Sequence, residues 1–174
     1  GPHRLARRPR DSGAALSTPQ FCASLPADVV GKVIVMSTPA QLAARLRAEA
    51  DDGSLESFCL DTGIDLLVLF GSAHVDATNA NDVDLAYSVD FSRAKAERPN
   101  VLDVVTAFYA RYGDGIDLMC LDTADTVAQH EALQKCELLV DPSNSKYGTL
   151  QMMAAREYIN TAYRREFELR SLMS

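Results

Sequence analysis

The sequence has no long hydrophobic run and no paired-cysteine spacing. Its most apolar stretch, Ile64 to Phe70, ends after seven residues and contains Asp65, whereas a membrane span needs about 20 apolar residues. The four cysteines form no CxxC pair or other metal-ligand spacing, which excludes a zinc-finger type of site. Unpaired cysteines are typical of a reducing cytosol. We therefore expect a cytoplasmic protein that does not span a membrane.

Positive charge is also scarce. The formal net charge is −7, and four of the 17 basic residues lie within residues 1–20. Residues 21–174 hold 13 basic and 23 acidic residues, a net charge of −10. Nucleic-acid backbones are bound by clustered Lys and Arg, so this balance argues against generic nucleic-acid binding. Such a surface can still hold cations, or a nucleotide that arrives with a metal ion.

A chain of 174 residues, 47% of them hydrophobic, is long enough for one domain with one core. Residues 1–20 mix Arg, Pro, Gly and Ser without periodicity, and we expect them to be a disordered leader or the remnant of a tag. We assign residues 21–174 to a single domain.

Hydrophobic periodicity and turn residues predict the order of elements along that domain. Strands are expected at Val29–Met36, Ile64–Phe70, Asp82–Val89, Gly115–Leu121 and Cys136–Val140. Helices are expected from Pro39 to about Gly53, and at Ser54–Thr62, Val101–Tyr112, Thr123–Lys135 and Tyr147–Leu172. This order predicts an α/β (α+β) fold in which helices flank a small mixed β-sheet and a long helix ends the chain.

The predicted C-terminal helix carries a stripe of large apolar residues at helical spacing. Such a stripe is usually buried by packing, and a docking face for a partner is the alternative. Its members are Met152, Ile159, Tyr163 and Phe167.

The most informative pattern joins two strands and the turn between them. Gly71 and Ser72 end an apolar strand and open a helix, where exposed backbone amides can bind phosphate. Asp82 and Asp84 are two residues apart on the next strand, so both point to one face. Asp117 lies on a third strand and would join them if the strands are neighbours. Three carboxylates beside a phosphate-binding turn predict a site for two-metal phosphoryl or nucleotidyl transfer.

This pattern resembles the minimal nucleotidyltransferases, called MNT proteins, of the DNA-polymerase-β-type superfamily. Members are often antitoxins that pair with HEPN-domain toxins. The resemblance covers about residues 55–172, and its motifs are LVLFGS (Leu67–Ser72), NDVDLAYSVD (Asn81–Asp90), GIDLMCLD (Gly115–Asp122) and HEALQKCELLVDPS (His130–Ser143).

The resemblance implies a polymerase-β-type nucleotidyltransferase fold and a role for each motif. Gly71 and Ser72 would hold the nucleotide triphosphate, with ATP as the substrate. Asp82 and Asp84 would bind two Mg²⁺ ions, and Asp117 would complete both the metal site and the catalytic set.

The sequence departs from the family pattern directly after Gly-Ser. The family usually continues with Arg-Ala-Arg-Gly, whereas this chain has Ala73, His74, Val75 and Asp76. A triphosphate then loses charge-assisted contacts worth about 1.5–3 kcal/mol each. His74 would partly substitute when protonated, or would be a solvent-facing loop residue. Tyr87 would line the base pocket, or would simply pack.

The sequence therefore predicts an Mg²⁺-dependent nucleotidyltransferase. The resemblance implies that it acts as an antitoxin and transfers AMP from ATP to a hydroxyl, a tyrosine in particular, of a HEPN-type toxin. One alternative is a toxin of the same fold that modifies tRNA 3′ ends. The net negative charge of residues 21–174 argues against this alternative. The other is a pseudo-nucleotidyltransferase with weak catalysis that neutralises its partner by binding, which the missing arginines favour and the three retained carboxylates oppose.

Overall fold

The computed structural model describes residues 37–172. The predicted leader, the strand predicted at Val29–Met36 and Cys22 lie outside the described residues. None of the helices in residues 37–172 combines the length and the apolar character that crossing a bilayer requires.

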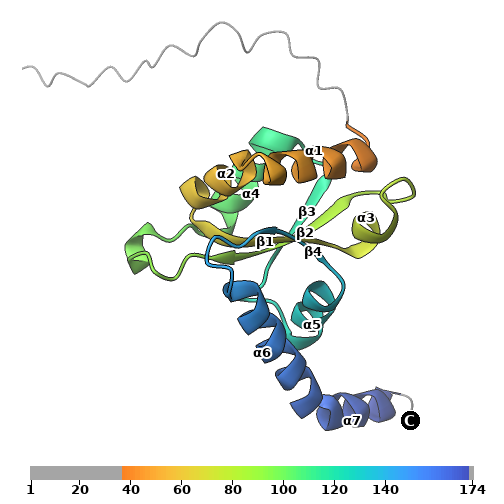
Figure 1. The fold of residues 1–174 in the computed structure, drawn as a ribbon. Coiled ribbons are helices and arrows are strands. Elements are labelled where there is room, and N and C mark those ends of the chain that lie inside the picture. The colour runs from red at the N-terminus through yellow and green to blue at the C-terminus, as the bar shows by residue number, and fades with distance from the viewer. Residues whose placement is uncertain (1–36, 173–174) are drawn as a thin grey trace, which may run out of the picture. The chain divides into compact units, whose positions relative to one another are not determined.

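A four-stranded mixed sheet forms the centre of the described region (Figure 1). Its strands are β1 (Ile64–Phe70), β2 (Val83–Val89), β3 (Ile116–Cys120) and β4 (Glu137–Val140), in the spatial order β3-β2-β1-β4. β1 is antiparallel to both β2 and β4, while β2 is parallel to β3. β1 lies inside the sheet and is almost wholly buried, as its continuous apolar run predicted. The predicted mixed sheet is confirmed.

Helices lie on both faces of this sheet. They are α1 (Pro39–Asp51), α2 (Ser54–Thr62), α3 (Gly71–Asp76), α4 (Val101–Tyr112), α5 (Thr126–Gln134), α6 (Lys146–Asn160) and α7 (Ala162–Leu172), and a short 3-10 helix, η2, spans Lys95–Glu97. Thr38 forms a capping box at the start of α1, and Asn100 forms one at the start of α4. Gly63 ends α2 in the left-handed conformation, so the helix stops where its sequence predicted.

The alternation of side chains along the strands gives the sheet two separate cores. Val83, Leu85 and Tyr87 of β2 point to the face covered by α1, α2 and α4. Ala86 points to the opposite face, together with Leu66 and residues of α5 and α6. The face to which a β2 side chain points therefore determines whether it packs in the core under α1, α2 and α4 or in the core with α5 and α6.

The C-terminal region corrects one prediction. We expected one helix over Tyr147–Leu172, whereas the structure has α6 and α7, which meet at Thr161. The Thr161 hydroxyl donates to the carbonyl of Glu157 at 2.8 Å, and a threonine that bonds to the preceding turn bends or ends a helix.

The apolar stripe of the C-terminal region is not buried within the described residues, contrary to the packing interpretation. Between 62% and 81% of each residue in the stripe remains exposed. These residues are Met152, Ile159, Tyr163 and Phe167.

A partly buried carboxylate links α1 to α4 through hydrogen bonds. Glu49 is 15% exposed and accepts hydrogen bonds from Arg111 and from the Tyr112 hydroxyl at 2.7 Å each, and from Arg45 at 2.8 Å. Burial by itself would raise the pKa of Glu49, but these three donors outweigh burial and lower it. A lowered carboxylate pKa means that ionised Glu49 stabilises the fold.

Replacing Glu49 with glutamine is expected to reduce the free energy of unfolding by about 2 kcal/mol at pH 7, since a charged acceptor is lost. Because the pKa of Glu49 is lowered on folding, its stabilisation is present above the unfolded value and is lost as the pH falls through the folded value. Urea unfolding from pH 7 to pH 3 should therefore show the difference between wild type and Glu49→Gln shrinking below pH 5. The exposed Glu131→Gln is the matched control. A difference that is constant with pH would contradict this role for Glu49.

Candidate functional site

Two of the predicted carboxylates lie side by side on neighbouring parallel strands. Asp84 of β2 is paired with Asp117 of β3, so their side chains point to the same face of the sheet. That face is the one that carries α5 and α6, because Ala86 belongs to the core on that side. The placement expected for Asp117, on a strand next to that of Asp84, is confirmed.

Asp82 completes the acidic group from just outside the strand. We expected it to be the first residue of the strand predicted at Asp82–Val89, but β2 begins at Val83 and Asp82 occupies the bend before it. Its carboxylate is exposed and is close enough to Asp84 to raise the pKa of that residue.

The electrostatics of the group centre on Asp84. Burial raises the pKa of Asp84, and the negative charges of Asp82 and Asp117 raise it further. A hydrogen bond from the backbone N–H of Ser72 acts in the opposite direction. Within residues 37–172, none of the three carboxylates forms an ion pair. The group therefore carries uncompensated negative charge.

The chemistry of this donor set suits a divalent cation. All three side chains offer carboxylate oxygens, which are the ligands that Mg²⁺ prefers. In the described part of the chain, no three His, Cys, Asp or Glu side chains converge closely enough to hold a metal ion as they stand. The residue types and their charge fit a magnesium site, although the side chains do not form a closed ligand set.

Gly71 forms the turn between β1 and α3 and brings that turn against Asp84. Its φ of +67° is in the left-handed region that favours glycine. A Cβ placed on Gly71 would lie 2.8 Å from Cγ of Asp84 and closer still to Oδ2. The absence of a side chain at position 71 therefore lets the Asp84 carboxylate reach the Ser72 amide.

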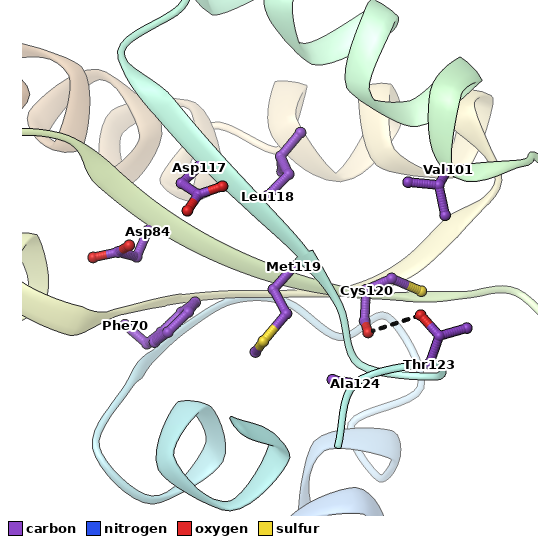
Figure 2. Close-up of a pocket in the computed structure, with 9 residues that line it drawn as sticks. All are labelled: Phe70, Asp84, Val101, Asp117, Leu118, Met119, Cys120, Thr123 and Ala124. Atoms are coloured by element: carbon purple, nitrogen blue, oxygen red, sulfur yellow. Dashed lines mark hydrogen bonds between the residues drawn. The ribbon is translucent and has the colours of Figure 1, made fainter. Parts of the chain in front are cut away.

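A cavity of about 560 Å³ opens beside the carboxylates, along β3 (Figure 2). We call it the carboxylate pocket. Asp84 and Asp117 lie on one side of it, and Thr123 donates to the Cys120 carbonyl on the other. Its lining contains no Lys or Arg and consists of Phe70, Asp84, Val101, Asp117, Leu118, Met119, Cys120, Thr123 and Ala124.

His74 lies on α3 and faces away from the carboxylate pocket, toward another acid. Its Nδ1 is 3.9 Å from Oε2 of Glu137 on β4, and Glu137 itself accepts hydrogen bonds from Arg47 Nε to Oε1 and from Arg47 Nη2 to Oε2. His74 is not among the residues that line the pocket. The structure therefore does not bring His74 together with the three carboxylates, and its predicted contact with the nucleotide stays a prediction.

Tyr87 points to the other face of the sheet from Asp84. It is 1% exposed and belongs to the core under α1, α2 and α4. Burial raises the pKa of its hydroxyl, and the neighbouring Cys120 thiol raises it further. Tyr87 is thus separated by the sheet from the carboxylates, and a role in nucleotide binding stays a prediction.

Sequence reasoning did not identify the apolar side of the site. Phe70 and Met119 lie on the same face as Asp84 and Asp117, and Val101 and Thr123 approach the site from the other end of β3 (Figure 2). The signal for Phe70 and Met119 was available, since each is an even number of strand positions from a residue on that face. Val101 and Thr123 reach the site through tertiary packing, which carries no local signal.

Three comparisons place the chain among known proteins. A scan against protein-family models finds no match. A search of curated proteins also finds no match. Solved structures do match. A chain of a toxin–antitoxin crystal structure with AMP-PNP is 16% identical, with a TM-score of 0.56 over 71% of this chain and 99% of that one.

Two further solved structures show the same likeness. One is a complex of a tri-AMPylated Shewanella oneidensis HEPN toxin with its MNT antitoxin, at 15% identity and a TM-score of 0.55, covering 74% of this chain and 99% of that one. The other is the MntA–HepT toxin–antitoxin structure, at 16% identity and a TM-score of 0.52, covering 72% and 99%. The described part of the chain therefore shares its fold with a chain in each of these toxin–antitoxin structures.

Proposed function

We propose that the protein is an Mg²⁺-dependent nucleotidyltransferase that acts as an antitoxin by transferring AMP from ATP to a hydroxyl of a HEPN-type toxin. The observation that carries the proposal is the register of Asp84 and Asp117 on parallel strands, beside the Gly71 turn, with no cation of the described chain to neutralise them. Uncompensated carboxylates that repel each other raise the free energy of the fold, which is expected where a ligand supplies the missing positive charge.

The proposed site divides its work among a few residues. The Gly71 turn faces the triphosphate with the Ser72 hydroxyl as a donor, because the Ser72 amide already donates to Asp84. Asp82, Asp84 and Asp117 hold the divalent cations, and Asp117 accepts the proton of the incoming hydroxyl. When bound, Mg²⁺ supplies positive charge that stabilises the negative charge developing at the α-phosphate.

The absence of basic residues from the pocket lining has a direct consequence for ATP binding. A triphosphate and three carboxylates repel one another, and no Lys or Arg lines the carboxylate pocket. We therefore expect ATP to bind only together with divalent cations. Weak binding would favour the alternative, a pseudo-enzyme that neutralises its partner by occlusion.

The fold comparison supports the proposed partner, and the free thiols support the proposed compartment. One of the similar structures contains a tri-AMPylated HEPN toxin in complex with an MNT antitoxin, which supports a HEPN-type partner for this chain. ATP, Mg²⁺ and free thiols are found together in the cytoplasm, where we place the protein. The net negative charge of residues 21–174 argues against the alternative in which tRNA is the acceptor.

The test is a transfer assay with ATP labelled on the α-phosphate, Mg²⁺ and a candidate HEPN-type toxin, to be sought among the products of adjacent genes. We expect label on that protein, no label when ATP carries it on the γ-phosphate, and no label in EDTA. Label on tRNA in place of the protein would favour the tRNA alternative. Neutralisation of the toxin without any label, and equally by the double variant Asp82→Asn/Asp84→Asn, would overturn transfer in favour of occlusion.

A further inference from the structure

The strand β3 has a free edge. It is the outermost strand on its side of the sheet, and within residues 37–172 it pairs with β2 alone (Figure 1). A strand at the edge of a sheet presents backbone N–H and C=O groups that can pair with a further strand. The question is therefore which of these groups in β3 are unpaired, and what surrounds them.

The hydrogen bonds of the ladder show which backbone groups face outward. The Val83 N–H donates to the Gly115 carbonyl at 3.0 Å, and the Leu121 N–H donates to the Tyr87 carbonyl at 2.8 Å. Because successive residues of a strand direct their backbone groups to alternate sides, the odd-numbered residues of 115–121 face β2 and the even-numbered ones face outward. Leu118 is in the middle of this outward row, and no hydrogen bond among residues 37–172 reaches its N–H or C=O.

The carboxylate pocket runs along this free edge. Its lining includes four consecutive residues of β3, Asp117–Cys120. Since successive side chains of a strand point to opposite faces, one cavity can touch all four only from the edge. Figure 2 shows these residues in succession along β3, between Asp84 and Val101. The pocket therefore provides space beside the unpaired backbone groups of β3.

The electrostatics of the edge favour one kind of occupant. Residues 112–134 contain five acidic residues and neither Lys nor Arg. Asp114 precedes β3 and Asp122 follows it, so an exposed carboxylate lies near each end of the edge, with Asp117 between them. No Lys or Arg lines the pocket. This edge therefore attracts a segment with basic residues at both ends, and repels an acidic segment or a nucleic-acid backbone.

We propose that the free edge of β3 binds a basic, extended segment of the partner protein as an added strand, with the acceptor residue opposite Asp117. This inference rests on the proposed function. Residues directly opposite each other on paired strands point to the same face, about 5 Å apart. A hydroxyl opposite Asp117 therefore lies on the face that carries Asp84 and Asp117. There its oxygen bonds to the α-phosphorus of ATP, pyrophosphate leaves, and the hydroxyl proton passes to Asp117.

An added strand suits this edge better than a helix does. A strand supplies both a carbonyl and an N–H to each outward-facing residue, such as Leu118. A helix satisfies its own backbone groups internally and would leave those of β3 without partners. Because β3 has five residues, Ile116–Cys120, the added segment spans about 17 Å. The partner is then recognised through the backbone of about five residues and through basic side chains beyond them.

Three synthetic peptides test this mode of binding. The probe is Ac-Lys-Val-Thr-Val-Thr-Val-Lys-NH₂, whose five central residues match the length of β3. The second peptide carries N-methyl groups on those five residues, which removes the backbone donors and keeps the side chains. The third has Glu in place of both Lys. In NMR titrations of the isotope-labelled protein, the probe should bind at least ten-fold more tightly than either of the others, with the largest shifts at the amides of Leu118 and Cys120.

Position 118 offers a matched pair of variants. Leu118→Pro removes the outward N–H, which the ladder to β2 does not use, and proline is tolerated at such positions of edge strands. Leu118→Ala also loses the leucine side chain but keeps the N–H. The probe should bind Leu118→Pro at least ten-fold more weakly than Leu118→Ala. If Leu118→Pro does not fold, the comparison of the probe with its N-methylated form on wild type decides.

Four results would overturn the proposal. Two of them are equal binding of the probe and its N-methylated form, and equal binding of the probe by the two variants. Displacement of the probe by Mg²⁺ and AMP-PNP would assign the groove to the nucleotide alone. Sedimentation of wild type as a dimer whose Leu118 amide is already protected from hydrogen exchange would assign the edge to a second copy of this chain.

The transfer assay with the candidate HEPN-type toxin separates this inference from the proposed function. If wild type labels the toxin, Leu118→Pro should have a KM for the toxin at least ten-fold above that of Leu118→Ala. Equal KM values would overturn strand addition and leave the proposed transfer standing. If wild type transfers nothing but still binds the probe as described, the proposed function fails while the edge of β3 remains a peptide-binding site.

Discussion

Replacing Asp84 with asparagine is expected to reduce AMP transfer by about 10³-fold while leaving the fold as stable as wild type or more so. Asparagine keeps an oxygen to accept the hydrogen bond from Ser72, but it removes one of three mutually repelling charges. A metal-supported transition state loses several kcal/mol when a charged ligand is removed, and about 4 kcal/mol corresponds to that factor. Label transfer and the melting temperature Tm, measured on the same preparation, check both halves of the prediction.

The expected difference in stability between wild type and Asp84→Asn depends on pH. Because burial and the neighbouring acids raise the pKa of Asp84 on folding, the fold prefers its protonated form, and that preference is lost as the pH rises through the folded value. Wild type should therefore lose stability relative to Asp84→Asn as the pH rises above about 4. Asp114→Asn, an exposed acid just before β3, is the control and should change neither activity nor Tm. A lower Tm for Asp84→Asn at pH 7 would show that Asp84 is a structural residue.

Alanine at position 71 is expected to abolish transfer and to destabilise the fold. The left-handed φ alone costs an alanine about 1–2 kcal/mol, and the added Cβ would overlap the Asp84 carboxylate. That carboxylate must move away from the Ser72 amide, so the phosphate-binding turn and a metal-binding side chain are displaced together. We expect a fall in Tm of about 5–10 °C and a loss of transfer of at least 10²-fold.

Gly53→Ala separates backbone strain from displacement of Asp84. Gly53 has a similar φ of +79°, but a Cβ there would meet no atom within 4 Å. Gly53→Ala should therefore lower Tm by the cost of strain alone and retain transfer. Equal transfer by Gly71→Ala and Gly53→Ala would contradict the role given to the turn beside Asp84.

Local patterns predicted the elements that position the site. The hydroxyl and proline at Thr38 and Pro39 marked the start of α1, and the apolar run of β1 predicted an interior strand. Two-residue alternation along β2 and β3 put Asp84 and Asp117 on one face once the two strands were neighbours. The sequence alone did not predict that β2 and β3 are neighbours, because these parallel strands are joined through α4 and pair over a long separation in the sequence.

The differences between the sequence-based predictions and the structure have identifiable physical causes. Tyr87 is three residues from Asp84, so strand alternation alone places it on the opposite face, and that signal was in the sequence. The break at Thr161 was not, because threonine is compatible with a helix and acts here through a hydroxyl hydrogen bond to Glu157. The contact between His74 and Glu137 joins α3 to β4, and no local sequence pattern predicts such a contact.

The central claim is that the three carboxylates bind a nucleotide through divalent cations. Calorimetric titration of AMP-PNP into the protein, in Mg²⁺ and in EDTA, tests it most directly. We predict binding in Mg²⁺, no detectable binding in EDTA, and at least 30-fold weaker binding by Asp84→Asn and Asp117→Asn than by Asp114→Asn. Equal affinity in EDTA, or unchanged affinity in the two site variants, would contradict the claim.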